Sequence, residues 1–124
     1  MNMTNKTQLP AVINTFIEAM NSHDGEAFIS CFAKDALCND FQRNFFGTEA
    51  IKRWSDKEMI GDKVTFQIDE VLEHYGEYLI TALTDGNYNK KMSPDPTYLD
   101  YFFTVRTDKI VRLIIMKNRE KSAK

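Results

Sequence analysis

Two kinds of periodicity divide the chain. Between Leu9 and Met20, apolar residues recur every three or four positions, which is typical of a helix with one apolar side. Asp24 can cap a second, short helix that ends near Phe32. After Gly61, apolar residues alternate with polar ones, as they do in strands. Helices followed by a run of strands predict an α+β fold.

The segment between these two regions is less regular. Residues 36–40 are a candidate short strand, and Gly47 begins a third predicted helix whose apolar side includes Ile51 and Trp54. That helix ends at Gly61. We therefore expect three helices before the main sheet.

Four strands are predicted in the second half of the chain. The first begins at Val64 and loses its alternation at Val71 and Leu72, which indicates a bend or a β-bulge. The others are expected over residues 77–84, 98–106 and 110–116. A tight hairpin at Thr107 and Asp108 joins the last two strands, and the proline-containing segment 89–96 is predicted to be a loop.

The last two strands are apolar on both faces. In the first of them, one face carries Leu99, Tyr101, Phe103 and Val105, and the other carries Tyr98, Asp100 and Phe102. An antiparallel sheet needs only one apolar face when the other meets water. The helices can cover only one of the two faces. We therefore predict a homodimer in which the second face packs against another copy of the chain.

Length, charge and cysteine content narrow the class of protein. The 124 residues predict a single domain over 1–124, with flexible tails at 1–6 and 119–124. A net charge of -2 gives no basic footprint for nucleic acid. No apolar stretch resembles a membrane span or an export signal, so we expect a cytoplasmic location. There, Cys31 and Cys38 are expected to be buried thiols rather than a disulfide.

Four segments carry a resemblance to a known family. They are FIEAMN at 16–21, CFAKDA at 31–36, FGTEAI at 46–51 and DKIV at 108–111. Their order and spacing resemble the nuclear transport factor 2-like superfamily, in particular its SnoaL-like and ketosteroid-isomerase-like branch. The resemblance implies a cone-shaped, cystatin-like fold. In that fold, helices lie over the concave face of a curved, mainly antiparallel sheet and enclose an apolar pocket.

Asp40 is the first candidate catalytic residue. The stretch 33–40 resembles the part of steroid isomerases that ends in the general base. The resemblance implies that Asp40 would shuttle a proton next to a carbonyl group, a role that suits a carboxylate beside an apolar pocket. The alternative is that Asp40 is a turn residue before Phe41, since aspartate is common in turns.

Asp100 is the second candidate. An aspartate in so apolar a strand must face solvent, find a partner or stay protonated. In steroid isomerases an aspartate at the matching position stays neutral and donates a hydrogen bond to the developing oxyanion. The resemblance implies that role for Asp100 and places the pocket on its face of the sheet. The alternative is a structural carboxylate paired with a nearby lysine or arginine.

Phe16 departs from the isomerase pattern. Steroid isomerases carry a tyrosine at this helix position as a second oxyanion donor, and phenylalanine cannot donate. Losing one such donor typically costs about 10²–10³ in rate. Phe16 is instead a candidate for the pocket lining or the core. The same two possibilities hold for the other apolar candidates, which are Trp54, Phe66, Phe102 and Leu113.

Two functions follow as hypotheses. The first is a cofactor-independent isomerase, dehydratase or cyclase that acts on a small apolar or cyclic carbonyl compound through Asp40 and Asp100. The second is a non-catalytic module that binds a small apolar ligand or a partner protein. With two histidines and no cysteine cluster, we expect no metal site. The enzyme hypothesis requires both aspartates to face one cavity.

Overall fold

The fold consists of one sheet with helices on one side. The structure, a computed structural model, describes residues 9–86 and 97–118. Within these ranges it contains three helices: α2 (Ala11–Ser22), α3 (Gly25–Ser30) and α4 (Gly47–Glu58). The six strands are β1 (Phe32–Asp40), β2 (Arg43–Phe46), β3 (Thr65–His74), β4 (Glu77–Asp85), β5 (Thr97–Arg106) and β6 (Lys109–Lys117).

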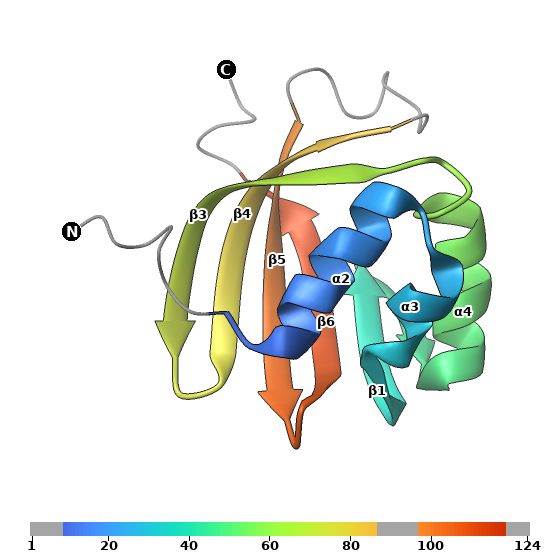
Figure 1. Cartoon of the computed structure of the whole chain (residues 1–124), viewed down its shortest axis with the longest axis horizontal. Coiled ribbons are helices and arrows are strands. Elements are labelled where there is room, and N and C mark those ends of the chain that lie inside the picture. Colours follow the sequence, from blue (N-terminus) through green and yellow to red (C-terminus); the bar gives the residue numbers. More distant parts are fainter. Residues whose placement is uncertain (1–8, 87–96, 119–124) are drawn as a thin grey trace.

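The strands form a single sheet in the order β2-β1-β6-β5-β4-β3. Strands β1 and β6 are parallel, and all other neighbours are antiparallel. Figure 1 shows α2 crossing one side of this curved sheet, with α3 and α4 beside β1. We call the side covered by helices the inner face and the opposite side the outer face. The α+β expectation is therefore confirmed.

The N-terminal helices begin and end where local chemistry favours it. Helix α2 follows Pro10, whose missing N–H costs nothing in a first turn. It ends at His23, which has a left-handed backbone with φ of 59°. The side chain of Asp24 accepts a hydrogen bond from the Ala27 N–H at 3.1 Å, so Asp24 caps α3 as predicted.

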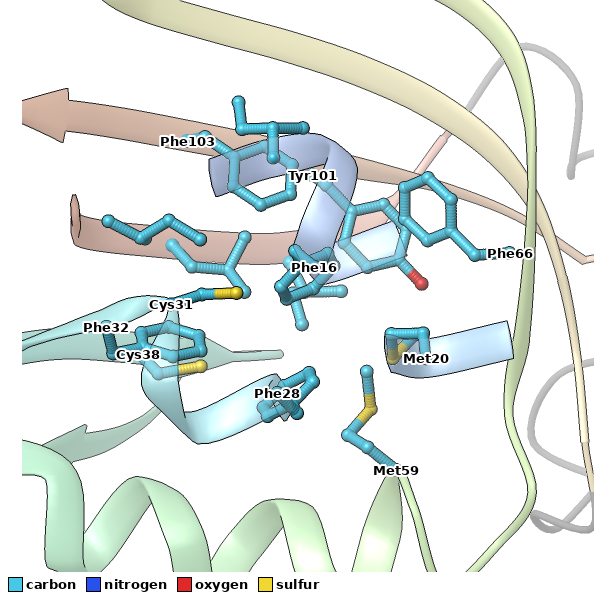
Figure 2. Packing of buried hydrophobic residues seen from close by; sticks show 14 of the residues in the cluster. Phe16, Met20, Phe28, Cys31, Phe32, Cys38, Met59, Phe66, Tyr101 and Phe103 are labelled. Atoms are coloured by element: carbon cyan, nitrogen blue, oxygen red, sulfur yellow. The ribbon is translucent and has the colours of Figure 1, made fainter. Parts of the chain in front are cut away.

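Phe16 lies at the centre of the core, between α2 and the sheet (Figure 2). Its ring centroid is 5.0 Å from that of Phe28 and 5.1 Å from that of Phe103. The rings of Phe32 and Phe66 lie at 6.3 and 6.0 Å. These separations are typical of packed aromatic pairs. The aromatic residues of the helices and of the sheet thus form one continuous core.

Three strand predictions differ from the structure. Strand β1 begins at Phe32, four residues before the predicted start at residue 36. Strand β2 was not predicted, because it is a four-residue edge strand whose side chains are mostly exposed and show no apolar alternation. The bulge in β3 lies between Ile68 and Glu70 rather than at Val71 and Leu72. Beyond this bulge, the side chain of Val71 is again buried in the core. The predicted loop at 89–96 and the predicted tails at 1–6 and 119–124 lie outside the described residues.

Three smaller expectations can be compared with the structure. The tight hairpin at Thr107 and Asp108 is confirmed, with φ of 52° and 62°. Cys31 and Cys38 are free and buried, as expected. Among the described helices, none is long and apolar enough to cross a membrane.

Candidate functional site

The strand register assigns each candidate side chain to one face of the sheet. Tyr101 on β5 pairs with Ile115 on β6, and Ile115 pairs with Asp40 on β1. Residues paired in this way share a face. Tyr101 and Ile115 are buried in the core beneath the helices. Asp40 therefore lies on the inner face, near the end of the sheet formed by β1 and β2.

Asp40 is held by two donors from different elements. The indole N–H of Trp54 on α4 donates to Asp40 Oδ2 at 3.1 Å, and Arg43 Nη2 on β2 donates to the same oxygen at 2.7 Å. The Asp40 side chain is only 15% exposed. Charge-assisted bonds of this kind fix the position of a carboxylate. The local role of Asp40 is thus to connect the β1–β2 hairpin to α4.

Arg43 also binds a second carboxylate. Its guanidinium donates to Glu58 on α4 at 2.6 and 3.0 Å, in a two-pronged arrangement. Hydrogen bonding to Arg43 lowers the pKa of Glu58 from its usual value. The bond to Glu58, together with those to Asp40, raises the pKa of Arg43. The ion pairs consequently favour the charged forms of Arg43 and Glu58.

Aromatic rings border this ionic cluster. Phe45 on β2 stacks on Trp54 with ring centroids 5.6 Å apart. The Arg43 guanidinium lies over the Phe45 ring at 5.5 Å from its centroid, a cation–π contact. The cluster is therefore an ion pair network supported by stacked aromatic rings, and it joins the sheet edge to α4.

Asp100 lies on the outer face of the sheet. Its strand neighbour Tyr101 is in the core, and successive side chains of a strand point to opposite faces. The Asp100 carboxylate accepts hydrogen bonds from Thr81 Oγ1 at 2.7 Å and from Asn118 Nδ2 at 3.0 Å. Strand alternation therefore places Asp40 and Asp100 on opposite sides of the sheet, so the requirement of the enzyme hypothesis that both face one cavity is not met.

The apolar candidates also divide between the two faces. Phe16, Trp54, Phe66 and Leu113 are buried in the core. Phe102 is not among them, because it pairs with Leu79 and Ile114 on the outer face. It borders a pocket of about 150 Å³ at the β3–β4 hairpin. The grouping of all five in one pocket lining is wrong for the same reason of strand alternation.

Sequence reasoning missed Tyr101 as a polar group of the inner face. Its hydroxyl lies 3.0 Å from Thr84 Oγ1, and both residues are buried. The available signal was that Tyr101 shares a strand face with Leu99 and Phe103, but only the structure shows that the helices cover this face. Arg43 and Glu58 were missed as well, because they come together only through the packing of α4 on β2.

Comparison with known proteins identifies the fold. No protein-family model matches the sequence, and no curated protein is significantly similar to it. Among solved structures, a Sinorhizobium meliloti protein provisionally assigned as a polyketide cyclase is 27% identical, with a TM-score of 0.78. That alignment covers 87% of this chain and 95% of the other.

Two further structures share the architecture at lower identity. An NTF2-like protein of unknown function from Cytophaga hutchinsonii is 14% identical, with a TM-score of 0.72. The alignment covers 96% of this chain and 99% of the Cytophaga chain. A Catenulispora acidiphila protein with a ketosteroid isomerase-like fold, solved with trimethylamine, is 17% identical. Its alignment covers 93% of this chain and 91% of its own, with a TM-score of 0.72. These likenesses confirm the resemblance seen in the sequence: this chain has the cystatin-like fold of the nuclear transport factor 2-like superfamily.

Proposed function

We propose that this chain is a non-catalytic binding protein of the nuclear transport factor 2-like fold, which binds a small apolar ligand and acts as a homodimer. One observation carries the proposal: Asp40 and Asp100 lie on opposite faces of the sheet. A base and an acid that serve one substrate must both reach a common reacting group. Two carboxylates separated by a sheet cannot do so.

The contacts of each carboxylate support the same conclusion. Oδ2 of Asp40 already accepts bonds from Trp54 and Arg43. Oδ1 of Asp100 accepts bonds from Thr81 and Asn118. Both carboxylates therefore have structural partners that account for their position without a substrate. Phe16, which replaces the expected tyrosine donor, is fully buried among other aromatic rings.

Ligand binding is supported by the chemistry of the inner face and by the related fold. Ligand pockets are lined mostly by apolar and aromatic side chains, with a few polar groups among them. Trp54 and Asp40 provide this combination beside α4. The Catenulispora protein was solved with a small molecule, trimethylamine. We infer that a small apolar ligand would bind between the helices and the inner face.

A hydrogen-exchange experiment tests the non-catalytic assignment. The protein is incubated in D₂O with a panel of cyclic ketones and enones, and loss of the protons next to the carbonyl is followed by NMR. Wild-type protein and Asp40→Asn are expected to give the same exchange rate as buffer. Saturation-transfer NMR on the same panel measures binding. Exchange that the wild type catalyses and Asp40→Asn does not would overturn the assignment.

The alternative function is an isomerase, dehydratase or cyclase. The similarity to a provisionally assigned polyketide cyclase favours it. On the inner face, Asp40 and Tyr101 would be the available base and donor, because they occupy the same register row across β5, β6 and β1. In the exchange experiment, this alternative predicts loss of catalysis in both Asp40→Asn and Tyr101→Phe.

The outer face supports the homodimer. Its central row is apolar and crosses four strands, through Leu72, Leu79, Phe102 and Ile114. Leu72 is 58% exposed, and two other outer-face residues, Phe46 and Met116, are 68% and 44% exposed. Exposed apolar patches of this kind mark interaction surfaces. We call the row of Leu72, Leu79, Phe102 and Ile114 the apolar row. Sedimentation equilibrium at micromolar concentration tests the dimer, and a monomer mass would contradict it.

The size of the outer face is sufficient for a stable dimer. Six strands spaced about 4.8 Å apart, each about eight residues long, cover on the order of 700 Å². A standard interface buries about 800 Å² on each partner. Packing of the whole outer face against a second copy therefore agrees with the area that such a complex requires.

A further inference from the structure

Charged residues of the outer face lie on both sides of the apolar row. One side is the Asp100 row, made of Glu70, Thr81, Asp100 and Met116. The other side is the Arg112 row, made of His74, Glu77, Thr104 and Arg112. On each strand, the residue in either of these rows is two positions away from the residue in the apolar row. The outer face thus has an acidic margin and a margin that contains an exposed arginine.

Among the described residues, each margin carries a charge without an ionic partner, Asp100 on one side and Arg112 on the other. Asp100 is bound by the neutral groups of Thr81 and Asn118, and no lysine or arginine of the described residues contacts it. Arg112 is exposed and has no hydrogen bond or ion pair within residues 9–86 and 97–118. In contrast, Glu77 on the same margin is paired with Arg106 at 3.6 Å.

Asp100 and Arg112 cannot pair within one chain. Asp100 is opposite Met116 on β6, and Arg112 lies four residues away along that strand. Four residues of a strand span about 13 Å. Moreover, the bonds to Thr81 and Asn118 hold the Asp100 carboxylate at its own row. Within residues 9–86 and 97–118, neither charge therefore has an ionic partner, and a second copy of the chain can supply one.

A two-fold axis can bring the two charges together. Rotation about an axis along the apolar row places that row of one copy on the same row of the other. It also exchanges the two margins, so that the Arg112 row of each copy faces the Asp100 row of its partner. Rotation about an axis parallel to the strands would instead place each margin on itself, with Asp100 and Glu70 facing like charges. Juxtaposed like charges disfavour an interface, whereas opposite charges select its register.

We propose that the homodimer forms about a two-fold axis parallel to the apolar row, with strands antiparallel across the interface and Arg112 of each copy paired with Asp100 of the other. This inference rests on the homodimer of the proposed function and specifies its geometry. It assigns Asp100 a role in recognition between subunits. The occupant of the outer face is thus a second copy of this chain.

Charge exchange tests the geometry. Sedimentation equilibrium is measured for Arg112→Asp, for Asp100→Arg and for the double variant. Each single variant places like charges together and is expected to weaken dimerisation by about tenfold or more, as close interfacial charge pairs do. The double variant restores the attraction and is expected to return the dimer dissociation constant to within a few-fold of wild type. Circular dichroism checks that each variant is folded.

A second measurement does not depend on Asp100→Arg, a change that also removes the hydrogen bonds from Thr81 and Asn118. Added salt is expected to weaken the wild-type dimer and to have much less effect on Arg112→Ala, because screening acts on the exposed ion pair. A wild-type protein that is monomeric contradicts the homodimer itself. A dimer that forms equally well in wild type, Arg112→Asp and Asp100→Arg leaves the homodimer intact and overturns the proposed axis.

Discussion

Phe16 determines how the helices meet the sheet. It is the residue of α2 whose ring contacts both the neighbouring helix, through Phe28, and the sheet, through Phe66 and Phe103. A residue that joins two layers contributes through apolar area and through close packing, because the surrounding side chains cannot collapse into the space that it leaves. The residue that lacks the isomerase hydroxyl is therefore also the centre of the core.

Phe16→Ala is expected to lower the free energy of unfolding by about 3–5 kcal/mol, as large-to-small changes of buried aromatics do. Urea denaturation measures the change. The matched control is Tyr75→Ala, because Tyr75 is 84% exposed and should tolerate truncation with little loss. If both variants were equally stable, Phe16 would not have the central packing role described here.

The Arg43–Glu58 pair predicts a pH-dependent contribution to stability. Because pairing lowers the pKa of Glu58 in the folded state, its contribution is present above the unfolded value of 4.5. It is lost as the pH falls through the lower folded pKa. Glu58→Gln is therefore expected to cost less than about 1 kcal/mol at pH 7, as partly exposed ion pairs do. The cost should disappear in acid.

Urea denaturation of wild type and Glu58→Gln at neutral pH and in acid checks this expectation. Glu18→Gln is the control, because Glu18 is an exposed glutamate on α2 whose carboxylate has no hydrogen bond or ion pair with the other described residues. If the difference in the free energy of unfolding between wild type and Glu58→Gln grew on acidification, Arg43 would not be stabilising the charged form of Glu58.

Among the elements, the β5–β6 hairpin is connected by residues that fit its turn poorly. Thr107 and Asp108 both have positive φ, of 52° and 62°, as a two-residue type I′ turn requires. A β-branched threonine is strained in the left-handed region, which Asn and Gly adopt more easily. The register of β5 and β6 is therefore maintained at some cost in local backbone energy.

Replacing this turn with Thr107→Asn and Asp108→Gly is expected to raise the free energy of unfolding by about 1 kcal/mol, because the left-handed conformation costs L-residues about that much. Thermal and urea denaturation provide the measurement. Thr65→Asn is the control, since Thr65 is an exposed threonine within β3. A loss of stability in the double variant would show that the threonine has a contact that outweighs its backbone strain.

Both thiols are buried, that of Cys31 between α3 and β1 and that of Cys38 within β1. Burial raises the pKa of Cys31 to about 11, and it raises the pKa of Cys38 as well. Since the thiolate is the reactive form, neither cysteine should react with Ellman's reagent at pH 8 in the folded protein. The expected result is slow labelling that accelerates in urea together with loss of helical circular dichroism. Rapid labelling of one thiol in the native state would contradict its burial.

At the scale of the whole molecule, the two faces of the sheet have different partners. The helices cover the inner face, whereas the outer face carries the apolar row and several exposed apolar residues. A face of this composition is stable in water only when another surface covers it or when its apolar area remains small. The proposed homodimer satisfies the first condition for the outer face.

Leu72→Lys is expected to weaken dimerisation at least tenfold, because a charge would be placed in the apolar row opposite the partner's own apolar row. Leu72 is already exposed, so the monomer should fold normally. Tyr75→Lys is the matched control, since Tyr75 is exposed but lies in the hairpin turn beyond the apolar row. Sedimentation equilibrium distinguishes the two variants. Equal weakening by both, or by neither, would exclude the apolar row as the dimer surface.

The sequence alone determined the order of helices and strands, the composition of each strand face and the resemblance to the superfamily. These follow from local rules: helix periodicity around Phe16, the cap at Asp24, and alternation along β5. Strand β2 was not predicted, because a short exposed edge strand has no periodic pattern of apolar residues.

Only the tertiary structure decided which face of β5 the helices cover. Alternation separates Asp100 from Tyr101 but does not say which of them points inward. That choice depends on the packing of α2 and α4 against residues far away in sequence, and it removed Asp100 from the site that contains Asp40. In the same way, Arg43 and Glu58 meet only through the packing of α4 on β2. Contacts between distant segments depend on the whole packed arrangement, so periodicity cannot reveal them.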